Sequence, residues 1–269
     1  MGPGTTKRSH ARIGALIIAF ALALTIKPAV AATDYTDLWW NPAEAGWGVN
    51  FVQSQGFIFA TFFIYGPSNE QTWYTGELAV GANGEFAGPL YDNSGSYFGA
   101  PWSPTARSLR EVGTVKFVPT SASAGTLTYS VDGVAVSKPM QRQSMKPVVL
   151  TGTYIGGVAV SVSGCTNPTN NYRSRRNFNL NVFNASATRQ FTFDLDLQDG
   201  SACRMAGTYE QTGQLMRAPA ATYACSDGLS ATASLSEVRA TSFGIEGRWT
   251  ATTGAGCVET GEFSAVRAL

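Results

Sequence analysis

The sequence predicts an all-β protein with two antiparallel, barrel- or sandwich-like modules and minimal helix after its first segment. Three observations predict this fold class. Period-two alternation of apolar and polar residues recurs along the chain, whereas helical periodicity is hard to find. Clusters of Gly, Asn, Asp and Pro separate the alternating segments, as turns separate strands. The composition also changes near residues 141–147, because five of the six tryptophans lie upstream and all four cysteines lie downstream.

Residues 1–32 are typical of a secretory signal peptide. Cationic side chains precede an uncharged, mostly apolar run at Ile13–Ile26, and Ala-Val-Ala at 29–31 supplies the small residues that signal peptidase requires. The apolar run is too short to span a bilayer comfortably, which disfavours a retained anchor. We therefore expect a mature chain that begins near Ala32 or Thr33, and an exported protein that is periplasmic or extracellular.

Removal of residues 1–32 leaves a slightly acidic chain without histidine. Four of the nineteen Lys and Arg lie in that segment, so fifteen face eighteen Asp and Glu, a net charge of −3. This balance argues against a nucleic-acid partner, which would be met by a basic surface. His10, the single histidine, also lies in that segment. Ser-His-Asp and Cys-His catalysis and histidine-bearing zinc sites are therefore excluded. We expect a non-enzymatic protein with no cofactor and no metal.

The change in composition places a module boundary at residues 141–147. We expect an aromatic-rich first module over residues 33–143 and a cysteine-bearing second module over residues 148–269. Both have ordinary small-domain lengths, and each has room for about six to eight short strands. Pro147 favours an extended linker between them.

The first module is organised around an aromatic turn, residues 37–51, with the sequence DLWWNPAEAGWGVNF. An Asn-Pro pair begins a turn that a later glycine can finish, and Trp47, Val49 and Phe51 then alternate as one face of a strand. Residues 57–65 are apolar on both faces, so we expect a central strand or a second face that meets something other than water. Further strands are expected at 71–80, 86–91 and 112–118.

The clearest hairpin is centred on the Asp-Gly pair at 132–133, which suits a two-residue type I′ turn because both residues tolerate positive φ. This register pairs Val131 with Val134 and Tyr129 with Val136. All four side chains then share one face, so the turn chemistry and the apolar pattern agree.

The second module shows the cleaner alternation. Apolar side chains recur at every second position over residues 178–182, 191–197 and 229–235, with Asn, Asp, Thr and Ser between them. One dry face and one wet face on each strand indicate a sandwich or a closed barrel of antiparallel strands.

The four cysteines predict two disulfides. Cys165, Cys203, Cys225 and Cys257 are even in number, follow a signal peptide and lack a C-x-x-C spacing. Three pairings are possible. The turn at 212–213 would bring Cys203 close to Cys225, leaving Cys165 to join Cys257 and to tie the first strand of the module to its last. Metal binding by four scattered thiolates is the alternative.

Acidic side chains, with Tyr, Lys and Ser, are the remaining candidates for catalysis. Two carboxylates that flank a sugar can hydrolyse a glycosidic bond. The first module offers Glu44, Glu70, Glu77 and Asp92, but no spacing singles out a pair. A carboxylate-dependent glycan hydrolase is therefore the alternative hypothesis and not the preferred one.

Two charged clusters in the second module have simpler explanations than a site. Asp194, Asp196 and Asp199 resemble a loose calcium-ligand series, but alternation with apolar residues makes the first two the exposed face of a strand. Arg173, Arg175 and Arg176 are expected to form a small cationic loop, exposed to solvent.

Aromatic side chains in turns supply the candidate ligand-binding site. Most rings should fill the core, but rings on loops cannot all enter one small barrel. They either plug its open end or form a stacking surface. We expect at least one of Trp39, Trp40 and Trp102 to be largely exposed, and Trp47 to be a core residue. The candidate ligand-binding residues are Trp39, Trp40, Asn41, Glu44, Trp73, Tyr91, Tyr97 and Trp102.

The WWNPxExGWG pattern at 39–48, with IFAT at 58–61 and TWY at 72–74, resembles a β module of many uncharacterised secreted bacterial proteins. The resemblance covers residues 34–143 and implies export and modularity, not an activity. Ala45 stands where that family has serine, and Phe62-Phe63 where Trp-Phe is common, so an exposed ring is missing. The cysteine-bearing module resembles a companion domain of the same exported proteins.

These observations favour a secreted or periplasmic, non-enzymatic β protein that binds a ligand or partner through its aromatic-rich first module. The partner would be a glycan, a small apolar ligand or another protein. The alternatives are the glycan hydrolase and a purely structural surface protein whose aromatic side chains are all core. No segment after residue 32 is apolar enough for a transmembrane helix, and disulfide-type cysteines disfavour an outer-membrane barrel.

Overall fold

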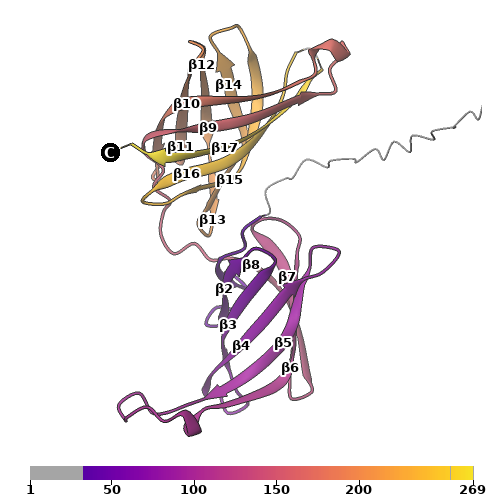
Figure 1. The fold of residues 1–269 in the computed structure, drawn as a ribbon, viewed down its shortest axis with the longest axis vertical. Helices are drawn as coiled ribbons and strands as arrows, with labels where there is room; N and C mark the ends of the chain where they lie inside the picture. Colours follow the sequence, from indigo (N-terminus) through magenta and orange to yellow (C-terminus); the bar gives the residue numbers. More distant parts are fainter. Residues whose placement is uncertain (1–32, 255, 269) are drawn as a thin grey trace, which may run out of the picture. The chain divides into compact units, whose positions relative to one another are not determined.

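The computed structural model describes residues 33–254 and 256–268, which form two closed antiparallel barrels (Figure 1). This confirms the predicted all-β class. The segment predicted to be a signal peptide, residues 1–32, lies outside the described residues. Within the described ranges, no helix is both long and apolar enough to cross a membrane.

The first barrel has eight strands in sequence order, and β1 closes it by pairing with β8, with Trp39 opposite Arg142. The expected strands at 57–65 and 71–80 have the predicted bounds, and the two that follow are longer than expected. The strands are β1 (Asp37–Trp40), β2 (Gly48–Ser54), β3 (Phe57–Tyr65), β4 (Gln71–Val80), β5 (Phe86–Ser94), β6 (Ser108–Pro119), β7 (Ala124–Val131) and β8 (Val134–Arg142), with a short 3-10 turn at Pro104–Ala106.

The hairpin between β7 and β8 has the predicted register. Val131 lies opposite Val134 and Tyr129 opposite Val136. Asp132 and Gly133 have φ values of 46° and 86°, as a type I′ turn requires. Tyr129 is buried in the barrel, whereas Val134 at the tip is exposed.

Aromatic side chains fill the interior of the first barrel. Trp39 and Phe117 have ring centroids 4.9 Å apart, Phe51 and Phe117 5.0 Å, and Trp39 and Phe51 5.7 Å, in edge-on or tilted contacts. All three are fully buried, and Tyr35 adds edge contacts to Phe117 and Phe86. Complete burial of a side chain of this size stabilises the fold by about 1.5–3 kcal/mol.

A buried ion pair completes this core. Arg142 Nη1 lies 3.2 Å from Asp37 Oδ2, and the two side chains are 1% and 5% exposed. The guanidinium also donates to the carbonyls of Ala122 at 2.7 Å and Thr36 at 3.0 Å, and it lies over the Trp39 ring. Both buried charges are thus compensated at short range, which is the condition for burying them.

The second barrel is a ring of eight strands in the order β9-β10-β11-β12-β14-β15-β16-β17, closed by pairing between β17 and β9. The short strand β13 pairs only with β14 and lies outside the ring. The strands are β9 (Gly152–Ser163), β10 (Tyr172–Ala185), β11 (Gln190–Leu197), β12 (Ala202–Thr208), β13 (Glu210–Thr212), β14 (Leu215–Cys225), β15 (Ser230–Ala240), β16 (Gly244–Thr252) and β17 (Val258–Arg267), with a 3-10 turn at Pro168–Asn170.

The segment before β9 closes one end of the second barrel. Val148 and Leu150 are buried in its core. Asn184, at the end of β10, fixes them, because its Oδ1 accepts from Leu150 N at 2.8 Å and its Nδ2 donates to the Val148 carbonyl at 3.0 Å. Tyr154 donates to the Leu150 carbonyl at 2.6 Å. The first residues of the expected second module therefore form a plug rather than a strand.

The two disulfides lie at the opposite end. They are Cys203–Cys225 and Cys165–Cys257, the pairing predicted from the sequence. Cys203 lies directly opposite Cys225 where β12 and β14 pair. The second bond joins the segment after β9 to the segment before β17, and these first and last strands of the module pair directly. Antiparallel alternation places all these strand ends at the same end of the barrel.

Candidate functional site

Burial and hydrogen bonds hold the aromatic turn in place within the first barrel. Trp39 is 1% exposed and Asn41 is buried, with Asn41 Oδ1 accepting from Ala43 N at 3.1 Å. Glu44 accepts from Lys138 Nζ at 2.8 Å and from Trp47 Nε1 at 3.2 Å. The hydrogen bond from Lys138 lowers the pKa of Glu44 below its usual range. These bonds tie the turn to β8 and keep Glu44 ionised.

The remaining residues of the sequence-predicted site differ in their exposure. Trp40 and Tyr91 are half-buried, whereas Trp73, Tyr97 and Trp102 are exposed. Among the described residues, no ring contact or hydrogen bond joins the exposed three to Trp39, Asn41 or Glu44.

The exposure of the tryptophans in the first barrel agrees with one of the two predictions made for them. Trp102 is 71% exposed, which confirms that at least one of Trp39, Trp40 and Trp102 is largely exposed. Trp47 was expected to be core. It is only half-buried, although it packs against the core cluster, because its indole N–H reaches out to Glu44.

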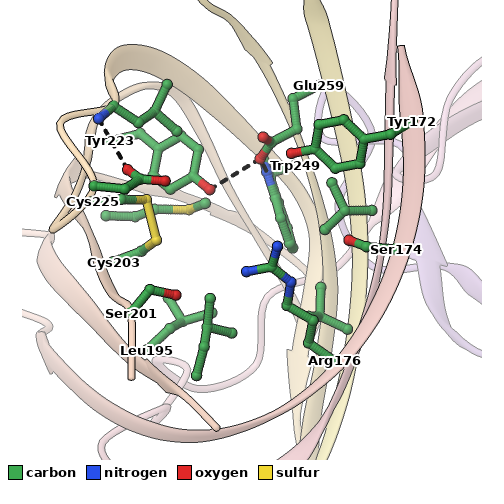
Figure 2. Close-up of a pocket in the computed structure, with 16 residues that line it drawn as sticks. Tyr172, Ser174, Arg176, Leu195, Ser201, Cys203, Tyr223, Cys225, Trp249 and Glu259 are labelled. Atoms are coloured by element: carbon green, nitrogen blue, oxygen red, sulfur yellow. Dashed lines mark hydrogen bonds between the residues drawn. A yellow bond between two sulfur atoms is a disulfide. The ribbon is translucent and has the colours of Figure 1, made fainter. Parts of the chain in front are cut away.

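A cavity of about 80 Å³ opens inside the second barrel, at the end that carries the disulfides (Figure 2). Sequence reasoning did not identify it. All strands of the closed ring except β15 contribute lining residues, and the turn between β14 and β15 contributes Asp227 and Leu229. Its lining combines an apolar floor with polar groups, and the residues used below are Tyr172, Ser174, Arg176, Cys203, Tyr223, Cys225, Asp227, Trp249 and Glu259.

Glu259 is the central polar group of the cavity. It is 5% exposed and lies on the inward face of β17, on the same side as Phe263 and Ala265. Its Oε1 accepts from Trp249 Nε1 at 2.9 Å and from the Tyr223 hydroxyl at 3.0 Å. No hydrogen bond to Oε2 and no ion pair to this carboxylate is found among the described residues. One carboxylate oxygen therefore remains available to the cavity.

The tyrosines beside Glu259 stay protonated at neutral pH. Burial raises the pKa of Tyr223 far above its usual value, and the negative charge of Glu259 raises it further. Burial and the charge of Glu259 also raise the pKa of Tyr172. Figure 2 shows the Tyr172 hydroxyl pointing toward the Glu259 carboxylate from the cavity mouth. Tyr172 is 49% exposed, so it lies between the cavity and solvent.

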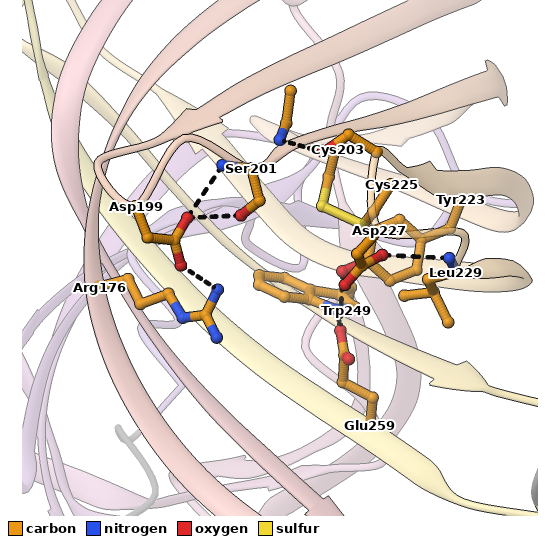
Figure 3. Close-up of a disulfide and its surroundings, with 12 residues drawn as sticks. Arg176, Asp199, Ser201, Cys203, Tyr223, Cys225, Asp227, Leu229, Trp249 and Glu259 are labelled. Atoms are coloured by element: carbon orange, nitrogen blue, oxygen red, sulfur yellow. Dashed lines mark hydrogen bonds and ion pairs between the residues drawn. A yellow bond between two sulfur atoms is a disulfide. The ribbon is translucent and has the colours of Figure 1, made fainter.

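A charged pair flanks the mouth (Figure 3). Arg176 Nη1 lies 2.8 Å from Asp199 Oδ2, and Asp199 is further fixed by Ser201, whose hydroxyl donates to it at 2.6 Å. Asp227 accepts from Leu229 N at 3.1 Å. The arginine cluster was expected in a loop. This was wrong, because residues 173–176 belong to β10, and alternation along that strand turns Arg176 toward the cavity.

The Cys203–Cys225 disulfide forms part of the cavity wall, beside Tyr223 (Figures 2 and 3). It fixes β12 to β14 at the mouth. The Cys165–Cys257 disulfide fixes the start of β17 two residues before Glu259. Both cross-links therefore hold the strands that carry the polar groups of the cavity.

Comparison with known proteins gives no functional assignment. No family model matches the chain, and no curated protein matches it. Among solved structures, the chain is similar to a protein with unknown function from the DUF3598 family of Nostoc punctiforme, at 9% sequence identity and a TM-score of 0.22. The likeness covers 86% of this chain and 93% of that chain. Function must therefore come from the chemistry of the molecule itself. In the described ranges, no cluster of three or more His, Cys, Asp or Glu could hold a metal ion.

Proposed function

We propose that this protein is an exported, non-enzymatic binding protein that holds a small ligand in the cavity of its second barrel. Two intramolecular disulfides are typical of proteins that fold in an oxidising compartment. The secretory pattern of residues 1–32 and the resemblance of the first module to secreted bacterial modules support the same setting.

The observation that carries the proposal is the half-satisfied carboxylate of Glu259. Oε2 accepts no hydrogen bond among the described residues, yet it is not one of the fully enclosed polar atoms, which are Trp40 Nε1 and Glu85 Oε2. It is therefore reached from the cavity, where a ligand can donate to it in place of water. The cavity wall is cross-linked and the opposite end of the barrel is plugged, so the site is pre-formed.

The experiment is a thermal-shift screen of the exported protein against a panel of small amines, sugars, nucleobases and short-chain acids. Ser174→Phe fills the cavity, because Ser174 lines it from β10. Ser234→Phe is the matched control, since Ser234 lies on the outward face of β15. We expect at least one compound class to raise the melting temperature of the wild type and of Ser234→Phe, but not of Ser174→Phe. The proposal would be overturned if no compound raised the melting temperature of the wild type. It would also be overturned if Ser174→Phe showed the same rise as the wild type.

A second role rests on the first barrel, whose outer face carries exposed rings. Phe63 lies opposite Trp73 across β3 and β4, and both side chains are about half exposed. Phe59 and Tyr65 extend this row along β3. The row accounts for a strand that is apolar on both faces. We propose that these rings stack on a glycan, since ring faces pack well on flat, weakly polar surfaces. Glycan-array signals that persist in Trp73→Ala would contradict this role.

A further inference from the structure

We propose that the ligand of the second barrel is a small organic cation whose ammonium group binds Glu259. This inference rests on the proposed function and names its ligand class. It is carried by the charge of the cavity, by the hydrogen-bonding capacity of Glu259 and by the surrounding rings.

The charge of Glu259 favours a cationic ligand. Glu259 is nearly fully buried, and it has no ion-pair partner among the described residues. Burying a carboxylate is costly unless a positive charge or several hydrogen bonds compensate it. The only basic side chain that lines the cavity within the described ranges is Arg176, and its guanidinium is paired with Asp199. A cationic ligand would supply the missing compensation.

The charged groups around the mouth are mostly acidic. Glu259, Asp227 and Asp199 are acidic and Arg176 is basic, so three negative charges and one positive charge leave a net charge of −2. An anionic ligand would enter against this field, whereas a cation would be attracted by it.

Glu259 also has unused capacity to accept hydrogen bonds. A carboxylate can accept about four hydrogen bonds, and Glu259 accepts two, both on Oε1. The indole N–H of Trp249 can only donate. The raised pKa of Tyr223 keeps its hydroxyl protonated, so that it donates as well. The neighbours therefore hold Oε1 and orient the carboxylate, while Oε2 is left for a donor that arrives from the cavity. An ammonium group carries several such donors.

Aromatic rings form part of the cavity wall. Tyr172, Tyr223 and Trp249 all line the cavity around Glu259 (Figure 2). Ring faces attract cations within about 6 Å of their centroids. At about 80 Å³, the cavity has room for a group of only a few heavy atoms. A larger ligand would leave its remainder at the mouth, beside Tyr172.

The experiment uses calorimetric titration of the full-length exported protein with four small probes. Tetramethylammonium chloride is the cation, tert-butanol its neutral analogue and sodium acetate the anion. Methylammonium chloride is the fourth probe, which tests the need for N–H donors. Glu259→Gln removes the charge but keeps an acceptor oxygen. Glu262→Gln is the matched control, because Glu262 lies on the same strand, pairs with Arg248 at 3.3 Å and does not line the cavity.

We expect the wild type and Glu262→Gln to bind at least one ammonium probe with dissociation constants that agree within about twofold. Glu259→Gln should bind it at least tenfold more weakly. The neutral probe, tert-butanol, and the anionic probe, acetate, should show no binding to the wild type. Equal binding by Glu259→Gln would overturn the inference. Binding of tert-butanol or acetate that Ser174→Phe abolishes would overturn the cationic class and leave the cavity as a binding site. If no probe of any charge binds, the inference fails together with the proposed function.

Discussion

The two barrels share one architecture but treat a buried acidic side chain in opposite ways. In the first barrel, Asp37 is paired with Arg142, whose guanidinium covers the Trp39 ring. In the second barrel, Glu259 is equally buried, but only neutral donors contact it. The comparison teaches that closing a β-barrel does not itself determine whether a buried acidic side chain receives a counter-charge.

The interiors differ in the same sense. Trp39, Phe51 and Phe117 interlock in the first barrel and leave its centre filled. In the second barrel, Val148 and Leu150 fill one end, while the end that carries the disulfides keeps a cavity. In the proposed functions, the first barrel is therefore a packed scaffold that binds at its surface, and the second is a container.

The largest expected effect lies in the filled core. Trp39→Ala should lower the free energy of unfolding by about 3–5 kcal/mol, because a large buried side chain is lost and a cavity remains. Trp102→Ala should change it by less than about 1 kcal/mol, because an exposed ring leaves no cavity. Chemical denaturation of both variants tests this difference. Similar losses for the two variants would contradict the assignment of Trp39 to the core and Trp102 to the surface.

The disulfides should come next. In the chain-entropy description a bond that closes a longer loop stabilises more. Cys165 and Cys257 are 92 residues apart and Cys203 and Cys225 are 22 apart. Replacing the first pair with serine should therefore cost about 4.6 kcal/mol, and replacing the second about 3.4 kcal/mol. Calorimetric unfolding should show these losses in the second barrel only. A matching loss in the first barrel would show that the two barrels do not unfold separately.

A smaller effect should appear at alkaline pH. Burial and Glu259 raise the pKa of Tyr223 above its ordinary value, so the native state keeps the proton that the unfolded chain releases above about pH 10. The contribution of protonated Tyr223 to the stability of the folded state is therefore complete below about pH 10, and it is lost as pH rises further. Tyr223→Phe should flatten the fall in stability above pH 10 by about 1 kcal/mol, measured by denaturation between pH 8 and 11. An unchanged slope would show that Tyr223 ionises normally.

Local chemistry predicted much of the fold. The Asp132-Gly133 turn and the alternation around it determined the β7–β8 register, and the turn near residue 212 was enough to pair Cys203 with Cys225. Both depend on residues close in sequence. The burial of Trp39 and the exposure of Trp102 depend on how eight strands close, which no local pattern contains.

The cavity was missed for a related reason. Polar side chains in an alternating strand were expected to face solvent. Extending the inward series of Phe263 and Ala265 backward along β17 reaches Glu259, and extending that of Phe178 backward along β10 reaches Arg176. The sequence therefore contained a sign of the cavity, because polar residues occupy positions that alternation turns toward the barrel interior. Only ring closure shows that the two strands face one cavity.

The most direct test of the central claim compares the unfolding free energies of Asp37→Asn and Glu259→Gln. Asp37→Asn leaves the buried charge of Arg142 without its ion-pair partner, so the free energy of unfolding should fall by about 3–5 kcal/mol. Glu259→Gln keeps the acceptor oxygen for Trp249 and Tyr223 and removes an uncompensated charge, so stability should stay within about 1 kcal/mol of the wild type or rise. A loss of 3 kcal/mol or more in Glu259→Gln would be about as large as that expected for Asp37→Asn. It would show that Glu259 is a structural group, and it would contradict the account of the second barrel as a container.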